Sequence, residues 1–320
     1  MILITGGAGF IGSNLARRIL QNGDARVICI DNLDNFYPRS KKLANIEPFR
    51  KNTNFKFIEG DILNPEHLNT LPDLDVIVHL AAKTGVRPSL SDPVNYYQVN
   101  SIGTQMLLEF ARERSISKFV FASSSSVYGV SNELPWSEQS ELLPISPYAS
   151  SKIAAEMMGR VYSSLYKIQF LVLRLFTVYG PGQRPDLAIQ NFFEAVLNDI
   201  PISVFGDGNS WRDYTFVEDV LDAIEGALNF SSAMYEIFNI GSQNPVSLNQ
   251  LIEEIEIVCG RKALINRLSY QNGDVPYTFA DITKAKTLIN YNPSHSIRQG
   301  LIKHHSWLKK NKQAGTHLIS

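Results

Sequence analysis

The first twelve residues of this 320-residue chain contain the feature that most constrains its fold. A short apolar run, Ile2 to Thr5, leads directly into the spacing Gly6-x-x-Gly9-x-x-Gly12, and an amphipathic run follows. The pattern predicts a strand, a tight turn and a helix. Glycines in such a turn let backbone N–H groups approach a pyrophosphate, and the helix N-terminus favours its negative charge. The chain therefore begins like a dinucleotide-binding sheet.

A carboxylate at the end of the second predicted strand indicates which dinucleotide is bound. Val27 to Ile30 forms that strand, and Asp31 and Asn32 follow it. Asp31 lies about 20 residues after Gly12, the separation expected for an acid that binds ribose hydroxyls. Because no arginine directly follows Asp31, the sequence predicts NAD rather than NADP. The alternative is a glycine-rich turn with an unrelated surface aspartate.

Strand and helix signals alternate over the first half of the chain. Several strands are unbroken apolar runs, as expected for parallel strands that are covered on both faces. The sequence predicts an α/β fold with a doubly wound parallel (Rossmann) sheet. The predicted strands are Ile2 to Thr5, Val27 to Ile30, Phe55 to Ile58, Val76 to Leu80, Phe119 to Ser123 and Phe170 to Leu173.

After Arg174 this alternation breaks. Residues 179–185 form a loop rich in proline and glycine, a helix is predicted from Ala188 to Asn198, and Tyr235 to Ile240 is expected to return to the large sheet. Residues 241–320 are expected to be mostly helical. We predict an NAD-binding domain of residues 1–175 and 210–240. A smaller, discontinuous, mainly C-terminal α/β domain of residues 176–209 and 241–320 would bind the substrate.

Composition excludes several classes of function. A net charge of −1 gives no field that favours nucleic acid or an anionic membrane. No apolar run approaches the roughly 20 residues that span a bilayer, and the glycines near the start do not fit a signal peptide. Cys29 and Cys259 lie far apart, as expected for reduced thiols in the cytoplasm. His304 and His305 are adjacent and cannot face one site on a helix, so no metal centre is expected.

Tyr148 and Lys152 lie four residues apart in a segment that predicts a helix, and Ser124 ends the strand before it. Residues at this spacing share one helical face. A lysine ammonium beside a tyrosine stabilises the phenolate, and a phenol whose pKa falls toward the working pH is a useful base. Surface helices often carry such a pair by chance, so its meaning depends on the glycine loop upstream.

The glycine spacing with Tyr-x-x-x-Lys downstream resembles the short-chain dehydrogenase/reductase superfamily. The length and the order of motifs resemble its extended branch, the NAD-dependent nucleotide-sugar epimerases and dehydratases. This resemblance implies that Ser124 and Tyr148 are catalytic, and that Lys152 is their electrostatic partner and also holds the nicotinamide ribose. It also implies a homodimer through a four-helix bundle, built from the two long helices predicted near 93–115 and 148–167.

The resemblance extends the cofactor site across the ends of four strands. Asp61 matches the acid that meets the adenine amino group, and the small residues after His79 allow close passage of the cofactor. Asn100 matches an asparagine that props the active-site helices, although it could equally be a polar residue inside a helix. The expected cofactor residues are Gly6, Gly9, Phe10, Ile11, Gly12, Asp31, Asn32, Asp61, Ile62, Leu80, Ala81, Ala82, Asn100, Tyr148 and Lys152.

The substrate handle implied by the resemblance is a uridine diphosphate. Arg212 matches an arginine that meets the pyrophosphate, which suits the planar fork of a guanidinium, and Phe205 matches a segment that holds uracil. Where many relatives place a second pyrophosphate arginine, this chain has Gln271, so either Arg298 or Arg87 replaces it or the phosphate is held more weakly. The expected substrate residues are Arg87, Ser124, Ser125, Ser126, Thr177, Arg184, Phe205, Arg212 and Asp274.

The residues after Ser124 indicate the reaction. Sugar dehydratases of this family carry an Asp-Glu pair there, and decarboxylases of nucleotide-linked uronic acids typically carry a glutamate. This chain has Ser125 and Ser126, whose hydroxyls do not suit acid–base work near neutral pH. We therefore expect 4-epimerisation through a 4-keto sugar, with tightly bound NAD regenerated in each cycle.

The segment 177–188 resembles that of UDP-glucuronate 4-epimerases. Ser125, Ser126 and Thr177 are predicted to form a hydroxyl cluster for a sugar carboxylate, with added charge from Arg184. In the alternative, the serines cap the strand end and Arg184 pairs with Asp186. UDP-glucose or UDP-N-acetylglucosamine is the alternative substrate. A sugar dehydrogenase or reductase that exchanges its cofactor and a non-catalytic NAD-binding regulator are the alternative functions.

Overall fold

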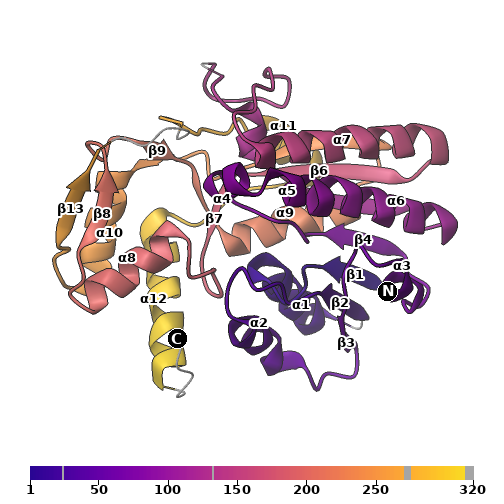
Figure 1. Ribbon diagram of the computed structural model, residues 1–320, viewed down its shortest axis with the longest axis horizontal. Helices are drawn as coiled ribbons and strands as arrows, with labels where there is room; N and C mark the ends of the chain where they lie inside the picture. Colours follow the sequence, from indigo (N-terminus) through magenta and orange to yellow (C-terminus); the bar gives the residue numbers. More distant parts are fainter. Residues whose placement is uncertain (24, 132, 270–274, 314–320) are drawn as a thin grey trace.

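The computed structural model describes residues 1–23, 25–131, 133–269 and 275–313, with the side chains of residues 312 and 313 excepted. At its centre is a seven-stranded sheet of order β11-β6-β5-β4-β1-β2-β3, in which every pairing is parallel (Figure 1). The predicted fold class is confirmed. The strands are β1 (Ile2–Thr5), β2 (Val27–Asp31), β3 (Phe55–Glu59), β4 (Val76–His79), β5 (Lys118–Ser124), β6 (Gln169–Leu175) and β11 (Tyr235–Ile240).

Successive side chains of the central strands point to opposite faces of the sheet and pack into two different hydrophobic cores, which explains the unbroken apolar runs. In β1, Leu3 belongs to the core beneath α6 (Gly103–Glu113) and α7 (Pro147–Tyr166). Its neighbour Ile4 belongs to the core beneath α1 (Phe10–Asn22) and α9 (Val217–Asn229). Helices therefore cover both faces of the sheet.

The strand order reverses at β1, which pairs with β2 on one side and with β4 on the other. In a doubly wound sheet the carboxyl ends of the strands at such a point diverge, and ligands bind in the crevice between them. Tyr235–Ile240 returns to the sheet as predicted, and pairs in parallel with β6.

The two long predicted helices differ in their regularity. The first is divided into α5 (Pro93–Tyr97), a π-helical segment η2 (Gln98–Ile102) and α6. The second is the continuous helix α7, which starts where the Ser146 side chain accepts a hydrogen bond from Ala149 N and Pro147 takes the first helical position. Pattern alone did not predict the wider turn in η2.

A third core forms among α8 (Ala188–Leu197), α10 (Leu248–Cys259) and α12 (Ile297–Gln313), on the left of Figure 1. Residues 241–320 also contribute strands, which the helical expectation missed. Three two-stranded sheets pair β8 (Ile202–Phe205) with β13 (Ile265–Leu268), β9 (Trp211–Arg212) with β12 (Val246–Ser247), and β7 (Thr177–Tyr179) with β10 (Tyr214–Phe216).

The shorter helices lie mostly in connections: α2 (Arg39–Ile46), η1 (Glu47–Phe49), α3 (Pro65–Asn69), α4 (Val86–Ser91), η3 (Ser125–Tyr128) and α11 (Thr283–Ile289). α11 packs against α9 and β11, beside the large sheet. The division into two domains stays a prediction. Within the described ranges, no helix combines the length and the apolar content needed to cross a bilayer.

Candidate active site

A cleft of about 420 Å³ opens at the carboxyl ends of β1, β2, β4 and β5. Every predicted cofactor residue except Asn100 lines it, and so do the predicted substrate residues Ser124, Ser125, Ser126, Thr177 and Arg184. Arg87, Phe205 and Arg212 are not part of this lining. Asp274 and Gln271 lie outside the described residues.

The glycine loop packs so closely that side chains would not fit. Gly6 has a φ of +66°, and a Cβ there would lie 2.9 Å from the Ala81 Cα. A Cβ on Gly12 would lie 2.4 Å from the Gly6 carbonyl oxygen. Helix α1 begins after Gly9 without a side-chain cap, so N–H groups of its first turn are available to an anion. This cradle fits a dinucleotide diphosphate.

Asp31 is fixed as an acceptor at the end of β2. Its carboxylate accepts hydrogen bonds from Ala8 N at 3.1 Å and from Leu33 N at 2.8 Å, and the Lys42 ammonium lies 3.7 Å away. Asn32 donates to the Asp61 carboxylate at 3.0 Å, which joins the ends of β2 and β3. These positions suit the ribose and adenine end of a dinucleotide.

Sequence reasoning missed the part of the cleft that follows β2. Phe36, Tyr37 and Lys42 line it, and the Lys42 ammonium lies 4.9 Å from the centre of the Tyr37 ring. No motif marks these positions. The only available signal was a pair of aromatic residues inside an otherwise polar loop.

A buried chain of hydrogen bonds ties β1 to β4 beneath the cleft. The Thr5 hydroxyl accepts from Leu80 N at 3.2 Å and from Ala81 N at 3.1 Å, and it lies 2.6 Å from His79 Nδ1. His79 Nε2 lies 3.0 Å from the Thr104 hydroxyl. Burial holds the pKa of His79 well below its usual value.

Asn100 acts on the protein rather than on the cleft surface. Its amide bonds both backbone groups of Lys83, at 2.8 and 2.9 Å, and donates to the Ser151 hydroxyl at 2.9 Å. Ser151 precedes Lys152 on α7, so Asn100 holds that helix against the loop after β4. This matches the expected propping role, and a direct cofactor contact stays a prediction.

The three predicted catalytic residues meet in the cleft. The Ser124 side chain is close enough to the Tyr148 phenol to lower its pKa, and the Lys152 ammonium donates to the Ala122 carbonyl at 2.9 Å. Burial lowers the pKa of Lys152 to about 7, and the negative charge of Glu156 partly offsets that effect.

The phenol does not have the lowered pKa that the sequence suggested. Burial raises the pKa of Tyr148, and this outweighs the Ser124 side chain and the charge of Arg184, which both lower it. Desolvation disfavours the phenolate, and the Lys152 ammonium is engaged with a carbonyl instead. Ionisation of Tyr148 therefore requires further positive charge in the filled site.

A buried ion pair, also missed from the sequence, lies behind Lys152. Glu156 and Arg174 are almost fully buried and form a two-pronged pair at 2.7 and 3.1 Å, and the Ser123 hydroxyl also donates to Glu156. Glu156 does not line the cleft. The one signal was its spacing, since Glu156 follows Lys152 by one helical turn on the same face.

Part of the predicted carboxylate site already has protein partners. The Ser124 hydroxyl accepts from Ser126 N at 3.2 Å and so caps η3. Arg184 forms a two-pronged pair with Asp186 at 2.8 and 3.0 Å, donates to the Thr84 hydroxyl, and lies over the Phe36 ring. The alternative pairing foreseen for Arg184 is therefore present.

The remaining residues predicted to contact the pyrophosphate or the base have different partners in the structure. The Arg87 guanidinium lies 5.2 Å from the centre of the Phe205 ring, so these two expected residues meet each other. Arg212 donates to the carbonyl of Trp211 at 2.8 Å. Arg298 pairs instead with Glu254 on α10 at the surface, which leaves Arg87 as the candidate to replace the missing arginine.

In the part of the chain that the structure describes, no group of three or more His, Cys, Asp or Glu side chains is arranged to hold an ion.

Comparisons with known proteins cover nearly the whole chain. Residues 2–241 match the model of the NAD dependent epimerase/dehydratase family. The UDP-glucuronate 4-epimerase of Thermodesulfobacterium geofontis is 40% identical over 97% of this chain and 96% of its own length.

Two solved structures superpose closely. The UDP-glucuronic acid 4-epimerase of Bacillus cereus, in complex with UDP-glucuronic acid and NAD, gives a TM-score of 0.92 at 38% identity, over 97% of this chain and 99% of the other. The UDP-glucose 4-epimerase of Thermotoga maritima, with UDP-glucose, gives 0.89 at 32% identity over the same shares.

Proposed function

Because the chain belongs to the NAD dependent epimerase/dehydratase family, we propose that it is a 4-epimerase of a UDP-sugar, with UDP-glucuronate and UDP-galacturonate as the favoured pair. The reaction oxidises C4 transiently to a ketone and returns hydrogen to the opposite face. One observation carries this proposal: Ser124, Tyr148 and Lys152 meet in a cleft whose neighbouring side chains at positions 125 and 126 are hydroxyls.

The position of the acids supports epimerisation over elimination. Among the described lining residues, the carboxylates are Asp31, Asp34 and Asp61, which follow β2 and β3. Asp31 ends β2, which is separated from β5 by β4 and β1, so it lies roughly 14 Å from Ser124 at the usual strand spacing. Asp34 and Asp61 already have partners, since Asp34 pairs with Lys83 at 3.6 Å and Asp61 accepts from Asn32. Glu156 is buried against Arg174. A ketone formed beside Tyr148 would meet no acid that could divert it.

NAD is the cofactor that this site fits. The glycine cradle would hold its diphosphate, Asp31 its adenosine ribose, and Lys152 its nicotinamide ribose. When bound, NAD supplies a reversible hydride acceptor next to the substrate. Its oxidised ring is positively charged, and this charge would offset the burial that raises the pKa of Tyr148.

The chain's own residues would then handle the proton. Tyr148 would take it from the C4 hydroxyl, hold it at the phenol oxygen while the sugar is a ketone, and return it to the epimer. Ser124 would hydrogen-bond the same oxygen. Lys152, whose pKa lies near neutrality, would favour the phenolate when protonated.

A uronic acid is favoured because three neutral hydroxyl side chains line the cleft and could hydrogen-bond its carboxylate. Ser125, Ser126 and Thr177 line the cleft beside Ser124. A 4-keto uronic acid loses CO₂ easily, so a site that preserves it should hold the carboxylate still without an adjacent acid. Similarity to the UDP-glucuronate 4-epimerases supports this choice, whereas similarity to a UDP-glucose 4-epimerase supports the alternative neutral sugar.

A panel of UDP-sugars tests the proposal. The purified protein, incubated separately with UDP-glucuronate, UDP-glucose and UDP-N-acetylglucosamine, should convert the first to its 4-epimer, with products separated by chromatography and assigned by NMR. Turnover of UDP-glucose with none of UDP-glucuronate would reject the carboxylate site. NAD recovered from the denatured protein, without accumulation of free NADH during turnover, would distinguish an epimerase from a dehydrogenase. Failure on every sugar would favour a regulator.

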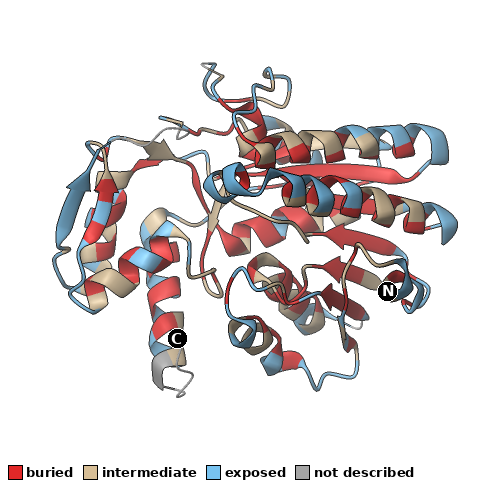
Figure 2. Ribbon diagram, viewed as in Figure 1, coloured by how far each residue is buried: buried red, intermediate tan, exposed pale blue. Residues whose placement is uncertain are grey.

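We also propose a homodimer through α5, η2, α6 and α7. Exposed residues recur along α7 (Figure 2). Among them are the apolar side chains Met157, Val161 and Leu165, one helical turn apart, and Val94 and Ile102 are exposed on the neighbouring segment. Such a stripe exceeds the scattered apolar residues of an ordinary surface. Pairing these helices with a second copy would bury it in a four-helix bundle.

A further inference from the structure

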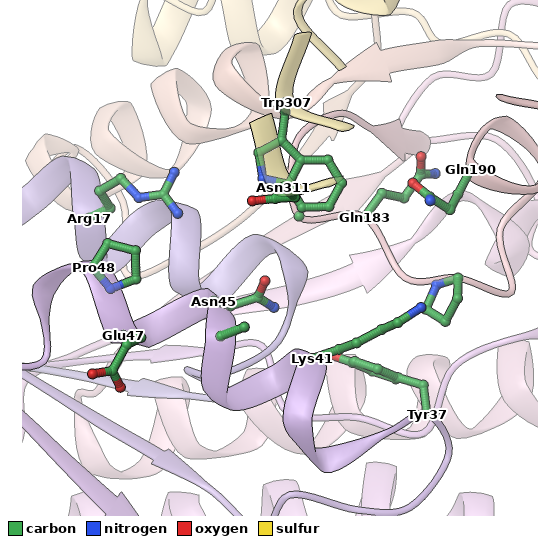
Figure 3. A pocket seen from close by; sticks show the side chains of 13 residues that line it. Arg17, Tyr37, Lys41, Asn45, Glu47, Pro48, Gln183, Gln190, Trp307 and Asn311 are labelled. Atoms are coloured by element: carbon green, nitrogen blue, oxygen red, sulfur yellow. The ribbon is translucent and has the colours of Figure 1, made fainter. Parts of the chain in front are cut away.

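A second cavity, of about 370 Å³, lies beside the candidate active site and is lined by a different set of residues (Figure 3). Its walls come from α1, α2, the turn at residues 182–185, α8 and α12. Segments from the start of the chain and from its last described helix therefore line the same cavity. Tyr37 is the one side chain that lines both this cavity and the active-site cleft in the described structure.

Three lining side chains are more than nine-tenths buried yet leave an oxygen atom without a hydrogen-bond partner in the described structure: Tyr37 Oη, Gln183 Oε1 and Gln190 Oε1. The Gln190 amide is oriented by its Nε2 group, which donates to Glu194 at 2.7 Å, so its oxygen is left to accept. Buried polar groups are nearly always paired. This concentration of three in one cavity indicates that something else supplies their partners.

The cavity also has an excess of positive charge. Arg17 and Lys41 line it, and neither forms an ion pair within the described part of the chain. Burial lowers the pKa of Arg17, and no nearby acid offsets this. Glu47, which also lines the cavity, already pairs with Arg50 at 3.5 Å. The side chains therefore favour an anion.

A flat apolar surface completes the lining. Trp307 contributes its indole, which is stacked on His304 at 5.6 Å between ring centres, and Pro48 and Pro185 add further apolar surface. In Figure 3, Trp307 and Asn311 lie between Arg17 on one side and the two glutamines on the other. A planar ring could lie against Trp307 while its charged end reaches Arg17.

We propose that this cavity binds a small organic anion with a planar ring that bears N–H donors, the chemistry of a purine nucleoside monophosphate. The phosphate would meet Arg17, the base would lie against Trp307, and its N–H groups would satisfy Gln183 and Gln190, while Lys41 adds positive charge to the cavity. The volume lies in the range of pockets that hold molecules of this size. The proposal does not depend on which sugar the active-site cleft accepts.

Binding here would act on the cofactor cleft through two residues. Tyr37 lies beneath the Lys42 ammonium, which is 3.7 Å from Asp31. Asn45, another lining residue, donates to the Ala8 carbonyl in the glycine loop at 3.1 Å. A ligand that fixes Tyr37 and Asn45 would strengthen NAD binding, and bound NAD would strengthen the ligand's binding by the same factor.

Calorimetric titration of the NAD-bound protein, with its substrate site saturated by UDP, tests this inference. AMP, GMP and inorganic phosphate are the probes. At least one nucleotide should bind with one site per chain, and phosphate should bind far more weakly. Arg17→Gln should weaken nucleotide binding roughly ten- to hundredfold, the effect of losing a charged hydrogen bond. Arg18→Gln is the matched control, because Arg18 pairs with Asp222 instead, and it should bind like the wild type.

Lys41→Gln provides a second variant should Arg17→Gln unfold, and Trp307→Phe should also weaken the nucleotides but not phosphate. Several results would overturn the inference. These are no binding of either nucleotide at millimolar concentration, equal binding by the Arg17 and Arg18 variants, phosphate binding as tightly as the nucleotides, or nucleotide binding that occurs only when UDP is left out. The first result would mean that ordered water alone satisfies the buried oxygens.

Discussion

Tyr148 and Glu156 lie two turns apart on one face of α7, and each faces a different serine of β5. Ser124 is close enough to Tyr148 to lower the pKa of the phenol, and Glu156 accepts a hydrogen bond from Ser123. Between them Lys152 donates to the carbonyl of Ala122. Three consecutive residues of one strand thus hold three successive turns of one helix. The relative positions of the proposed catalytic groups are set by the packing of these two elements.

Tyr148→Phe should reduce epimerisation by at least about a thousandfold, because it removes the group that transfers the proton. The variant should still fold and retain NAD, since only a hydroxyl is lost. Initial rates with the best UDP-sugar, together with NAD content and circular dichroism, would measure this. Tyr166→Phe, at an exposed position on the same helix, should keep full activity. Unchanged turnover in Tyr148→Phe would remove the catalytic assignment.

Lys152 should make stability depend on pH in the cofactor-free protein. Burial lowers its pKa to about 7, whereas an unfolded lysine titrates near pH ~10.4. Between these values the unfolded chain binds more protons, so the free energy of unfolding rises with pH. From pH 7 to 9 the wild type should gain about 2 kcal/mol more than Lys152→Met.

Urea unfolding of the two proteins at both pH values measures this difference. Lys310→Met, which changes an exposed lysine on α12, should follow the wild type. Parallel pH profiles for the wild type and Lys152→Met would show that Lys152 titrates alike in the folded and unfolded chains.

Glu156→Gln should destabilise the fold strongly, because it leaves the guanidinium of Arg174 buried without its counter-charge. Breaking a buried pair of this kind costs about 3–5 kcal/mol. Glu59→Gln is the matched control, since Glu59 forms a two-pronged pair with Arg39 at the surface, where solvent screens the attraction. If both variants lose a similar free energy of unfolding, burial of the pair between Glu156 and Arg174 does not make it more important for stability than the surface pair.

Thr177→Val should impair the uronic acid selectively. Losing one hydrogen bond to a carboxylate should lower kcat/KM for UDP-glucuronate roughly tenfold or more, with little effect on any turnover of UDP-glucose. Thr215→Val makes the same change on the paired strand β10, at a hydroxyl that has no partner among the described groups. It should leave both rates unchanged. An equal loss on both sugars in Thr177→Val would argue against a carboxylate contact.

Leu165→Glu should convert the proposed dimer to a monomer, because it places a charge in the apolar stripe of α7. Light scattering after size exclusion would report the mass. Ile302→Glu, at a similarly exposed site on α12, should not alter it. A monomeric wild type, or a variant that stays dimeric, would contradict the proposed interface.

The sequence predicted those parts of the site whose chemistry is local. The glycine spacing of the first turn, the carboxylate at the end of β2, and the four-residue spacing of Tyr148 and Lys152 can each be recognised within a short stretch of sequence. The strands of the sheet were found for the same reason, because burial on both faces leaves unbroken apolar runs.

Features that depend on long-range packing were not predictable in this way. The raised pKa of Tyr148 results from burial by segments far apart in the chain. The partnership of Glu156 with Arg174 joins a helix to a strand. Two-residue strands such as β9 and β12 are too short to show a period. Asn100 lies in the wide turn of η2, but the amino acids of this segment do not differ in type from those of an ordinary α-helix.

The hydrogen bonds among Thr5, His79 and Thr104 beneath the cleft allow only one assignment of donors and acceptors. Because Thr5 already accepts from two backbone N–H groups, its hydroxyl hydrogen must point to His79 Nδ1. Thr104 in turn donates to the Asn100 carbonyl at 2.6 Å, so the imidazole must carry its single hydrogen on Nε2. A second hydrogen on that ring would have no acceptor left to meet. Burial already holds the pKa of His79 well below its usual value, so on acidification the floor of the cleft should still be uncharged when an exposed imidazole has taken up its second proton.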